Sequence, residues 1–222
     1  MPEEQYRALV RYLVPVDLPV GLRLSEPNRP VESIYFPVSG LITIHALTEL
    51  GESVEIGIIG REGLSGLAGL LGHEQMPHSV VMQSAGTGMR IRTGILREEF
   101  LKGGAFAQTI YSFIYMQMVQ MGQLVLCARL HSVDARMGRW LLTAADRTES
   151  EEIAITQESL AQMLGSRRST VTVAAGDLQR KGLIDYTRGR VRIVDRPGLE
   201  AASCECYTVI RAAYEQFARR LG

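Results

Sequence analysis

A run of 26 residues without any charged side chain, residues 103–128, divides the chain into two parts. About 20 apolar residues are enough to span a bilayer, so the length of this run would allow a transmembrane helix. Four glutamines lie within it, however, and no dense cluster of basic residues flanks it. Because glutamine is costly in hydrocarbon, we expect no membrane span but a long helix buried against protein.

The apolar residues of this expected helix recur at steps of three, four and seven residues. Such spacing is typical of a seam that packs against a partner helix. The seam consists of Ile110, Ile114, Met121, Leu124 and Ala128. We expect two copies of the chain to pair along it as a homodimer; the alternative is a core helix internal to one copy.

The residues before this helix favour β structure. Between residues 21 and 94, short apolar or alternating runs are separated by Gly, Pro and Asn, as in an antiparallel β-roll or barrel. The expected strands cover residues 33–38, 41–47, 53–59, 79–83 and 89–95. A glycine cluster between them indicates a short helix or loop.

The residues after the long helix indicate a helix-turn-helix. An amphipathic helix is expected over residues 132–147, and Thr156 can cap a short helix that ends in a tight turn at Gly165 and Ser166. A further helix is expected over residues 167–181. Its inward residues are Val171, Ala174, Ala175 and Leu178. Its opposite face is polar and built of small residues, so it could enter the major groove of DNA.

The distribution of charge supports a local site for phosphate. The chain has 24 basic and 24 acidic side chains, but residues 165–196 carry eight Lys or Arg against three Asp. Arg167 and Arg168 stand in the first turn of the second helix, where the helix dipole makes a cation cost ~0.3–1 kcal/mol. A DNA phosphate or guanine at this helix end would offset that cost. The alternative is a solvated arginine pair.

A small hairpin with a basic tip is expected over residues 184–193, because apolar residues alternate on both sides of a turn. The turn carries Arg188 and Arg190, which could neutralise phosphates of the DNA backbone without reading its sequence. Helix-turn-helix, hairpin and dimer helix together predict binding to double-stranded DNA.

In this order of parts the chain resembles the Crp/Fnr family of bacterial transcription regulators. The resemblance extends over nearly the whole chain and is most specific in ITQESLAQMLGSRRSTVTVAAGDLQRKGLIDYTRGRVRIVD, residues 155–195. It implies an α+β fold with a cyclic-nucleotide-binding-like β-roll sensor domain (1–102), a dimerisation helix (103–131) and a winged helix-turn-helix DNA-binding domain (132–222). It also implies a cytoplasmic homodimer that regulates transcription from a palindromic promoter site, with RNA polymerase as a further partner.

The resemblance also implies individual DNA contacts. Arg168 takes the place of a guanine-contacting arginine, and Gln157 and Thr170 take backbone-contacting positions. Arg167 stands at a serine position, and Ser169 replaces a frequent glutamate, so the half-site is expected to differ from the usual consensus. The expected DNA-binding residues are Gln157, Arg167, Arg168, Ser169, Thr170, Thr172, Arg188 and Arg190.

The sensor half departs from the family's cyclic-AMP site, which uses a Gly-Glu pair for the ribose and an Arg-Ser pair for the phosphate. The corresponding pairs are Gly66-Leu67 and His78-Ser79. Leucine cannot accept a bond from a ribose hydroxyl, and neutral histidine is a weak substitute for guanidinium around an anion. We therefore expect a degenerate effector pocket that does not bind cyclic AMP; the identity of any small-molecule effector is open.

The three cysteines, Cys127, Cys204 and Cys206, fit a reduced protein, because their number is odd. Residues 1–126 contain none, which excludes the N-terminal iron–sulfur cluster of the family's oxygen-responsive branch. Cys204 and Cys206 alone fall short of a tetrahedral zinc site, and isolated histidines do not indicate haem. We expect no metal and no cofactor.

Catalytic motifs are also missing from the sequence: there is no nucleophile elbow, Walker loop or paired His-Glu metal helix. We expect that the chain is not an enzyme. The remaining alternative is a ligand-binding module that regulates a protein partner rather than DNA. An acidic second helix would have supported that alternative, and Arg167 with Arg168 does not.

Overall fold

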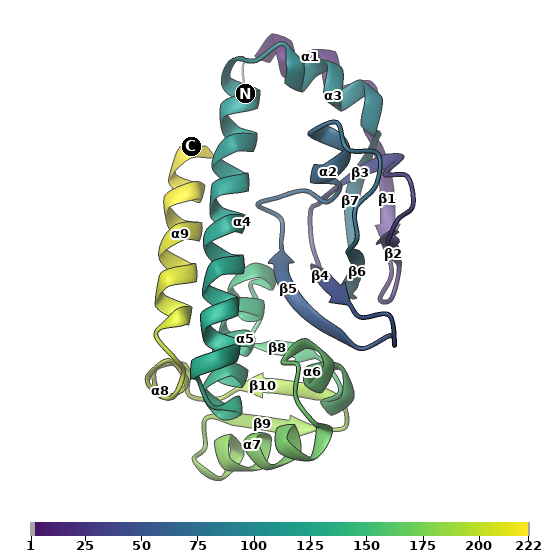
Figure 1. Ribbon diagram of the computed structural model, residues 1–222. Coiled ribbons are helices and arrows are strands. Elements are labelled where there is room, and N and C mark those ends of the chain that lie inside the picture. Colours follow the sequence, from purple (N-terminus) through teal and green to yellow (C-terminus); the bar gives the residue numbers. More distant parts are fainter. Residues whose placement is uncertain (1–2, 222) are drawn as a thin grey trace.

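The computed structural model describes residues 3–221 and shows a β-roll beside a long helix, with a smaller helical part at one end of both (Figure 1). The helices are α1 (Glu3–Val10), α2 (Leu67–Leu70), α3 (Thr93–Leu101), α4 (Gly104–Leu130), α5 (Val133–Thr148), α6 (Gln157–Met163), α7 (Arg168–Arg180), α8 (Arg196–Ala202) and α9 (Cys206–Leu221). The strands are β1 (Val14–Leu18), β2 (Arg23–Ser25), β3 (Ser33–Pro37), β4 (Leu41–Leu47), β5 (Ser53–Ile59), β6 (Ser79–Ser84), β7 (Gly86–Arg92), β8 (Glu152–Ala154), β9 (Ile184–Thr187) and β10 (Arg190–Ile193). The α+β architecture expected from the sequence is confirmed.

The β-roll consists of two antiparallel sheets with the strand orders β1-β7-β3 and β2-β6-β4-β5. The expected strands over 33–38, 41–47, 53–59 and 79–83 correspond to β3, β4, β5 and β6. The fifth expected strand was placed three residues too late. The strand β7 begins at Gly86 and ends at Arg92, and α3 begins at Thr93, whose hydroxyl donates to the carbonyl of Val31 (2.5 Å). The short strands β1 and β2 were not expected.

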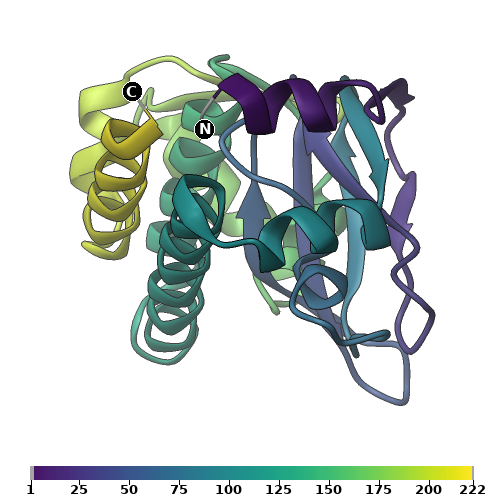
Figure 2. The same ribbon diagram turned by 90° about the horizontal axis from the view of Figure 1, so that it is seen from above.

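Among the described residues, α4 is the one helix that is long and apolar enough to cross a membrane by length and composition alone. Its packing accounts for this composition, because α4 lies against α9 on one side and β5 on another (Figures 1 and 2). Gln120 accepts a hydrogen bond from the backbone nitrogen of Ile58 (2.8 Å) and donates one to its carbonyl (3.1 Å). A glutamine that is costly in lipid is thus satisfied by a neighbouring strand.

The seam expected along α4 is only partly exposed. Ile110 and Leu124 are buried within one copy of the chain, so they are not free to meet a second copy. Ile114 and Met121 are half-buried, whereas Ala128 is exposed. A different apolar face is exposed, and it includes Tyr111, Met118 and Val125.

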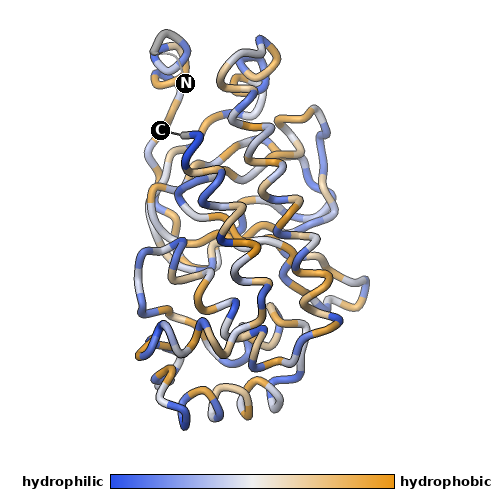
Figure 3. The backbone as a smooth tube through the Cα atoms, turned by 90° about the vertical axis from the view of Figure 1, so that its left-hand side faces the viewer, coloured by the Kyte–Doolittle hydropathy of each residue, from blue (hydrophilic) through white to orange (hydrophobic). Residues whose placement is uncertain are grey.

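The last helix, α9, returns antiparallel along α4, and the two helices lie side by side (Figures 1 and 3). Near the end of α9, the ring of Phe217 lies 5.8 Å from the ring of Phe113, and Arg220 donates to the hydroxyl of Ser112 (3.0 Å). The C-terminal part therefore packs back onto the helix from which it started.

The β-roll has a hydrophobic core of its own, and the core of the C-terminal part extends to the end of the roll. Trp140 and Leu141 of α5 and Val171 of α7 lie at the centre of the latter core, above the sheet β8-β10-β9. Leu41 of β4 and Ile58 of β5 belong to the same cluster of buried residues. The helix-turn-helix is thus fixed against the end of the β-roll, and α5 also packs against α9.

Candidate nucleic-acid interface

The two short helices α6 and α7 form around a tight turn. The hydroxyl of Thr156 accepts a bond from the backbone nitrogen of Ser159 (3.1 Å) and so caps α6, as expected. Gly165, with a φ of 53°, turns the chain between the helices. The expected inward residues of α7 are buried: Val171, Ala174, Ala175 and Leu178. The opposite face of α7 is left to solvent.

This exposed face of α7 carries Arg168, Ser169, Thr172, Val173 and Gly176. Arg167 is the N-cap residue and makes no side-chain hydrogen bond that caps the helix. The helix N-terminus therefore presents free backbone N–H groups next to two guanidinium groups, which is an arrangement that binds anions.

Gln157 and Thr172 connect the two helices at this surface. The hydroxyl of Thr172 donates to the side-chain oxygen of Gln157 (2.7 Å), which leaves the amide nitrogen of Gln157 as the donor for a ligand. A groove of about 670 Å³ runs from these residues past Val173 to Arg180 of α7 and Tyr186 of β9. The recognition surface is thus continuous from α6 across α7 to the hairpin.

The hairpin β9–β10 turns through Arg188 and Gly189, whose φ angles of 41° and 82° are both left-handed. Two left-handed residues define a type I′ turn, which matches the twist of the flanking strands. Glycine adopts this conformation freely, but arginine adopts it at a cost of ~1–2 kcal/mol. The structure therefore holds Arg188 at an unfavourable backbone position at the hairpin tip.

The cations of this surface fall into two groups. Arg190 pairs with Glu152 (2.9 Å), and Arg180 pairs with Asp177. Within residues 3–221, no salt bridge is found for Arg167, Arg168 or Arg188. These three are the guanidinium groups that a polyanion would meet without displacing an acidic partner.

The residues of the expected effector pocket lie in different settings. Gly66, with a φ of 84°, precedes α2, and Leu67 begins it; a side chain at Gly66 would meet β3. Ser79 is buried at the start of β6. His78 lines a cavity of about 390 Å³ between β5, α4 and α6, whose lining does not include the other three residues.

That cavity is largely apolar, with Met121, Leu124 and Val125 of α4 among its lining residues. Burial lowers the pKa of His78, which disfavours its charged form. A neutral histidine has itself little attraction for a phosphate anion; the positive charges of this lining are Arg136 and Arg139.

Two sequence models of known domains match the chain. Residues 16–102 match the cyclic nucleotide-binding domain, and residues 135–202 match the Crp-like helix-turn-helix domain. The chain belongs to the Crp/Fnr family of DNA-binding transcription regulators. No curated protein matches it in sequence.

Solved structures agree with this assignment of the regulator at the level of the fold. A protein assigned to the Crp/Fnr transcriptional regulators from Eubacterium rectale has a TM-score of 0.71 at 20% identity, with 95% of each chain covered. FixK2 from Bradyrhizobium japonicum has a TM-score of 0.74 at 13% identity, covering 86% of this chain and 98% of FixK2. The c-di-GMP-responsive regulator CLP from Xanthomonas campestris has a TM-score of 0.66 at 15% identity, with 86% and 98% covered. As a member of this family, the regulator is not an enzyme.

One residue of the regulator's exposed α7 face was missed by sequence reasoning. Val173 is 64% exposed, although valine in an amphipathic helix is usually buried. Its position one helical turn after Ser169 and one before Gly176 is the signal that could have placed it on the polar face.

Proposed function

We propose that this regulator acts as a homodimer that places one α7 helix in each of two adjacent major grooves of a palindromic promoter site. The observation that carries this proposal is the set of unpaired guanidinium groups of Arg167, Arg168 and Arg188 on one exposed surface. Arg168 reads guanine by two parallel hydrogen bonds, whereas Arg167 and Arg188 neutralise phosphates.

The remaining contacts follow from the geometry of the same surface. The amide nitrogen of Gln157, held by Thr172, and the hydroxyl of Thr170 donate to backbone phosphates. The methyl groups of Val173 meet the methyl group of a thymine. Ser169 accepts or donates a single bond, and Arg190, which must share its charge with Glu152, contributes less than Arg188.

The exposed apolar face of α4 supports the dimer. Tyr111, Tyr115, Met118, Gly122 and Val125 follow each other at steps of four, three, four and three, which is the spacing of a coiled-coil seam. A side chain added at Gly122 would meet no atom within 4 Å, so a partner helix could approach closely there. Two copies joined along this face present two α7 helices, and adjacent major grooves require them about 34 Å apart.

We propose further that residues 1–102 are a sensor domain that does not bind cyclic AMP, because a leucine and an uncharged histidine stand where the nucleotide needs charged partners. Residues 103–131 form the dimerisation helix and residues 132–222 the DNA-binding domain. We propose that the protein acts in the cytoplasm, where it meets promoter DNA and RNA polymerase.

Selection of bound sequences from random duplex DNA tests the proposal. We expect an enriched site with two-fold symmetry and half-site centres ~10 base pairs apart, or a multiple of this. Arg168→Ala should cost ~1–3 kcal/mol and relax the preference at one position of each half-site. Lys181→Ala, at the exposed far end of α7, is the matched control. An asymmetric site, or an affinity that does not change with salt, would overturn the proposal.

A further inference from the structure

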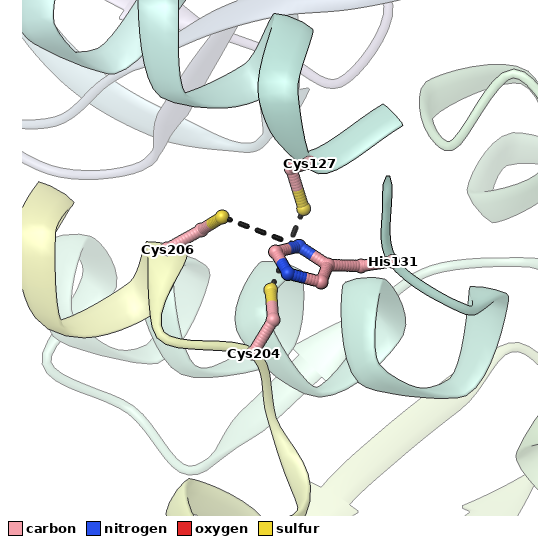
Figure 4. A group of neighbouring side chains, drawn as sticks. All are labelled: Cys127, His131, Cys204 and Cys206. Carbon is pink, nitrogen blue, oxygen red and sulfur yellow. Dashed lines mark hydrogen bonds between the residues drawn. The ribbon is translucent and has the colours of Figure 1, made fainter. Parts of the chain in front are cut away.

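Four side chains that can bind a metal ion meet where α4 ends. They are Cys127, His131, Cys204 and Cys206, and their ligand atoms all lie within 4.8 Å of one another (Figure 4). Cys127 comes from the last turn of α4 and His131 from the residue after this helix. Cys204 lies in the link between α8 and α9, and Cys206 is the first residue of α9. The sequence alone showed only Cys204 and Cys206 as a pair, and the structure brings Cys127 and His131 beside them.

We propose that these four side chains bind one zinc ion in a closed tetrahedral site that fastens α9 to the end of α4. Three sulfurs and one imidazole nitrogen are a common ligand set of structural zinc. The sulfur of Cys127 lies 3.4 Å from that of Cys204, and the sulfur of Cys206 lies 3.4 Å from Nδ1 of His131. In a tetrahedron with zinc–sulfur bonds of ~2.3 Å, ligand atoms are about 3.8 Å apart, so small rotations of these side chains admit the ion.

The imidazole of His131 is oriented as a zinc ligand would be. Its Nδ1 faces Cys206, and its Nε2 lies 3.2 Å from the carboxylate of Glu205. A histidine that binds metal through one nitrogen commonly donates the other N–H to a carboxylate, which fixes its tautomer and orientation. Glu205 lies between Cys204 and Cys206 in the sequence, and its carboxylate is the acceptor for this N–H of His131.

The backbone holds both ligand segments in place. The nitrogen of His131 donates to the carbonyl of Cys127 (3.2 Å), which fixes the two ligands of the α4 end relative to each other. The nitrogen of Tyr207 donates to the carbonyl of Cys204 (3.0 Å), which fixes the turn into α9. The cluster therefore does not depend on one flexible loop closing around an ion.

The charge of the surroundings also suits the ion. Zinc with three thiolates has one net negative charge, and two arginines of α5 lie close by. They are Arg136 and Arg139, of which Arg139 is buried. Cys127 and both arginines also line the 390 Å³ cavity, which offers a path for the ion.

A disulfide between Cys127 and Cys204 is the competing use of the same sulfurs. It would engage only two of the four groups and would leave Cys206 and His131 without a function at the point where they converge. Zinc uses all four. The metal site does not depend on the proposed DNA binding, so the failure of one leaves the other testable.

Metal analysis of the full-length protein, purified under reducing conditions, tests the site. We expect about one zinc per chain and, after replacement by Co²⁺, the visible absorption of tetrahedral cobalt with thiolate ligands. Cys206→Ser and His131→Ala should lose most of the bound zinc. His73→Ala, at an exposed histidine outside the cluster, is the control and should retain it.

A further variant guards against misfolding, because His131→Cys keeps four ligands. We expect it to retain zinc and to shift the cobalt spectrum towards that of a four-thiolate site. Titration of the metal-free wild-type protein with Co²⁺ needs no variant at all. A titration without the tetrahedral spectrum, equal zinc in wild type and His131→Ala, or a Cys127–Cys204 disulfide in place of zinc in the protein as purified would each overturn the proposal.

Discussion

At the scale of single residues, a substitution at Arg188, whose backbone is in the left-handed region, should affect stability and DNA binding in different ways. Arg188→Asn should leave the free energy of unfolding unchanged or raise it by up to ~1 kcal/mol, because asparagine tolerates this conformation better than arginine. The same change removes one phosphate contact, so the slope of log affinity against log salt should fall by about 1.

Thermal unfolding and fluorescence anisotropy at several salt concentrations measure the two effects of Arg188→Asn. Arg192→Gln is the control, since Arg192 lies in the same hairpin but pairs with Asp185 (3.6 Å). A salt slope equal to that of the wild type would show that Arg188 meets no phosphate.

Glu55 of β5 is a buried carboxyl group, and burial raises its pKa to about 7. Trp140 of α5 donates to it (2.7 Å), and the charge of Arg139 opposes the rise. A carboxyl group whose pKa is higher in the folded chain binds its proton more tightly there. The protonated carboxyl group therefore stabilises the fold fully below its ordinary pKa. This contribution to stability is lost as the pH rises to about 7.

Glu55→Gln should remove this pH dependence, because glutamine keeps an acceptor for Trp140 and carries no charge. Relative to the wild type, the variant should gain up to ~3 kcal/mol between pH 5 and pH 8. Urea unfolding at both values measures this. His45→Gln serves as the control. His45 lies opposite Glu55 in β4, and burial shifts its pKa in the other direction, downwards. Parallel changes in wild type and Glu55→Gln would contradict the prediction.

In the helix-turn-helix, the sequence predicts the role of a residue where one local pattern defines that role. Thr156 as a cap and Val171 as an inward residue follow from spacing along a single helix. His131 could not be found in this way, because its partners Cys204 and Cys206 lie more than 70 residues further along the chain. Only the packing of α9 against α4 brings them together.

At the scale of elements, α4 shows that hydrophobic periodicity predicts a helix but does not predict which face of it is buried. Its length and its lack of charge predict a long buried helix, but the sequence contains two apolar faces about a quarter turn apart. Which face remains free is decided by α9, and α9 itself was not expected. The buried residues Tyr207, Ile210 and Phe217 recur at helical spacing and could have revealed it.

The exposed face of α4 is tested by Val125→Glu. Val125 is 74% exposed in one copy of the chain, so the change should leave the fold of that copy intact. In a dimer it places two carboxylates near the two-fold axis, which should weaken dimerisation by at least ~2 kcal/mol, or about 30-fold. Analytical ultracentrifugation measures the dimer, and Leu101→Glu, at an apolar position of α3 that is 63% exposed, is the control. Equal dimerisation of both variants would show that the dimer interface does not include this face.

At the scale of the whole molecule, the β-roll and the DNA-binding part are joined by two ion pairs with very different burial. Glu62, which follows β5, pairs with Arg147 of α5 (3.3 Å), and both side chains are at most 3% exposed. The neighbouring residues Arg61 and Glu149 also pair, but both are more than half exposed. The guanidinium of Arg147 further stacks on the ring of Tyr214 of α9 (3.6 Å). The buried pair therefore links three parts of the molecule, whereas the exposed pair links two and is surrounded by solvent.

Breaking the buried pair should therefore loosen the whole molecule. Arg147→Ala leaves the carboxylate of Glu62 buried without a counter-ion, with only the backbone nitrogen of Gly60 donating to it (3.0 Å). This should cost ~3–5 kcal/mol and divide one cooperative unfolding transition into two. Arg61→Ala, the matched change in the exposed pair, should cost less than ~1 kcal/mol. Because Glu62→Gln removes the stranded charge, adding it to Arg147→Ala should restore part of the loss. Differential scanning calorimetry of the four proteins measures both quantities. A similar small cost for both arginine variants would mean that the two parts are held together by the apolar core of the C-terminal part, through Leu41 and Ile58, and not by the buried charges.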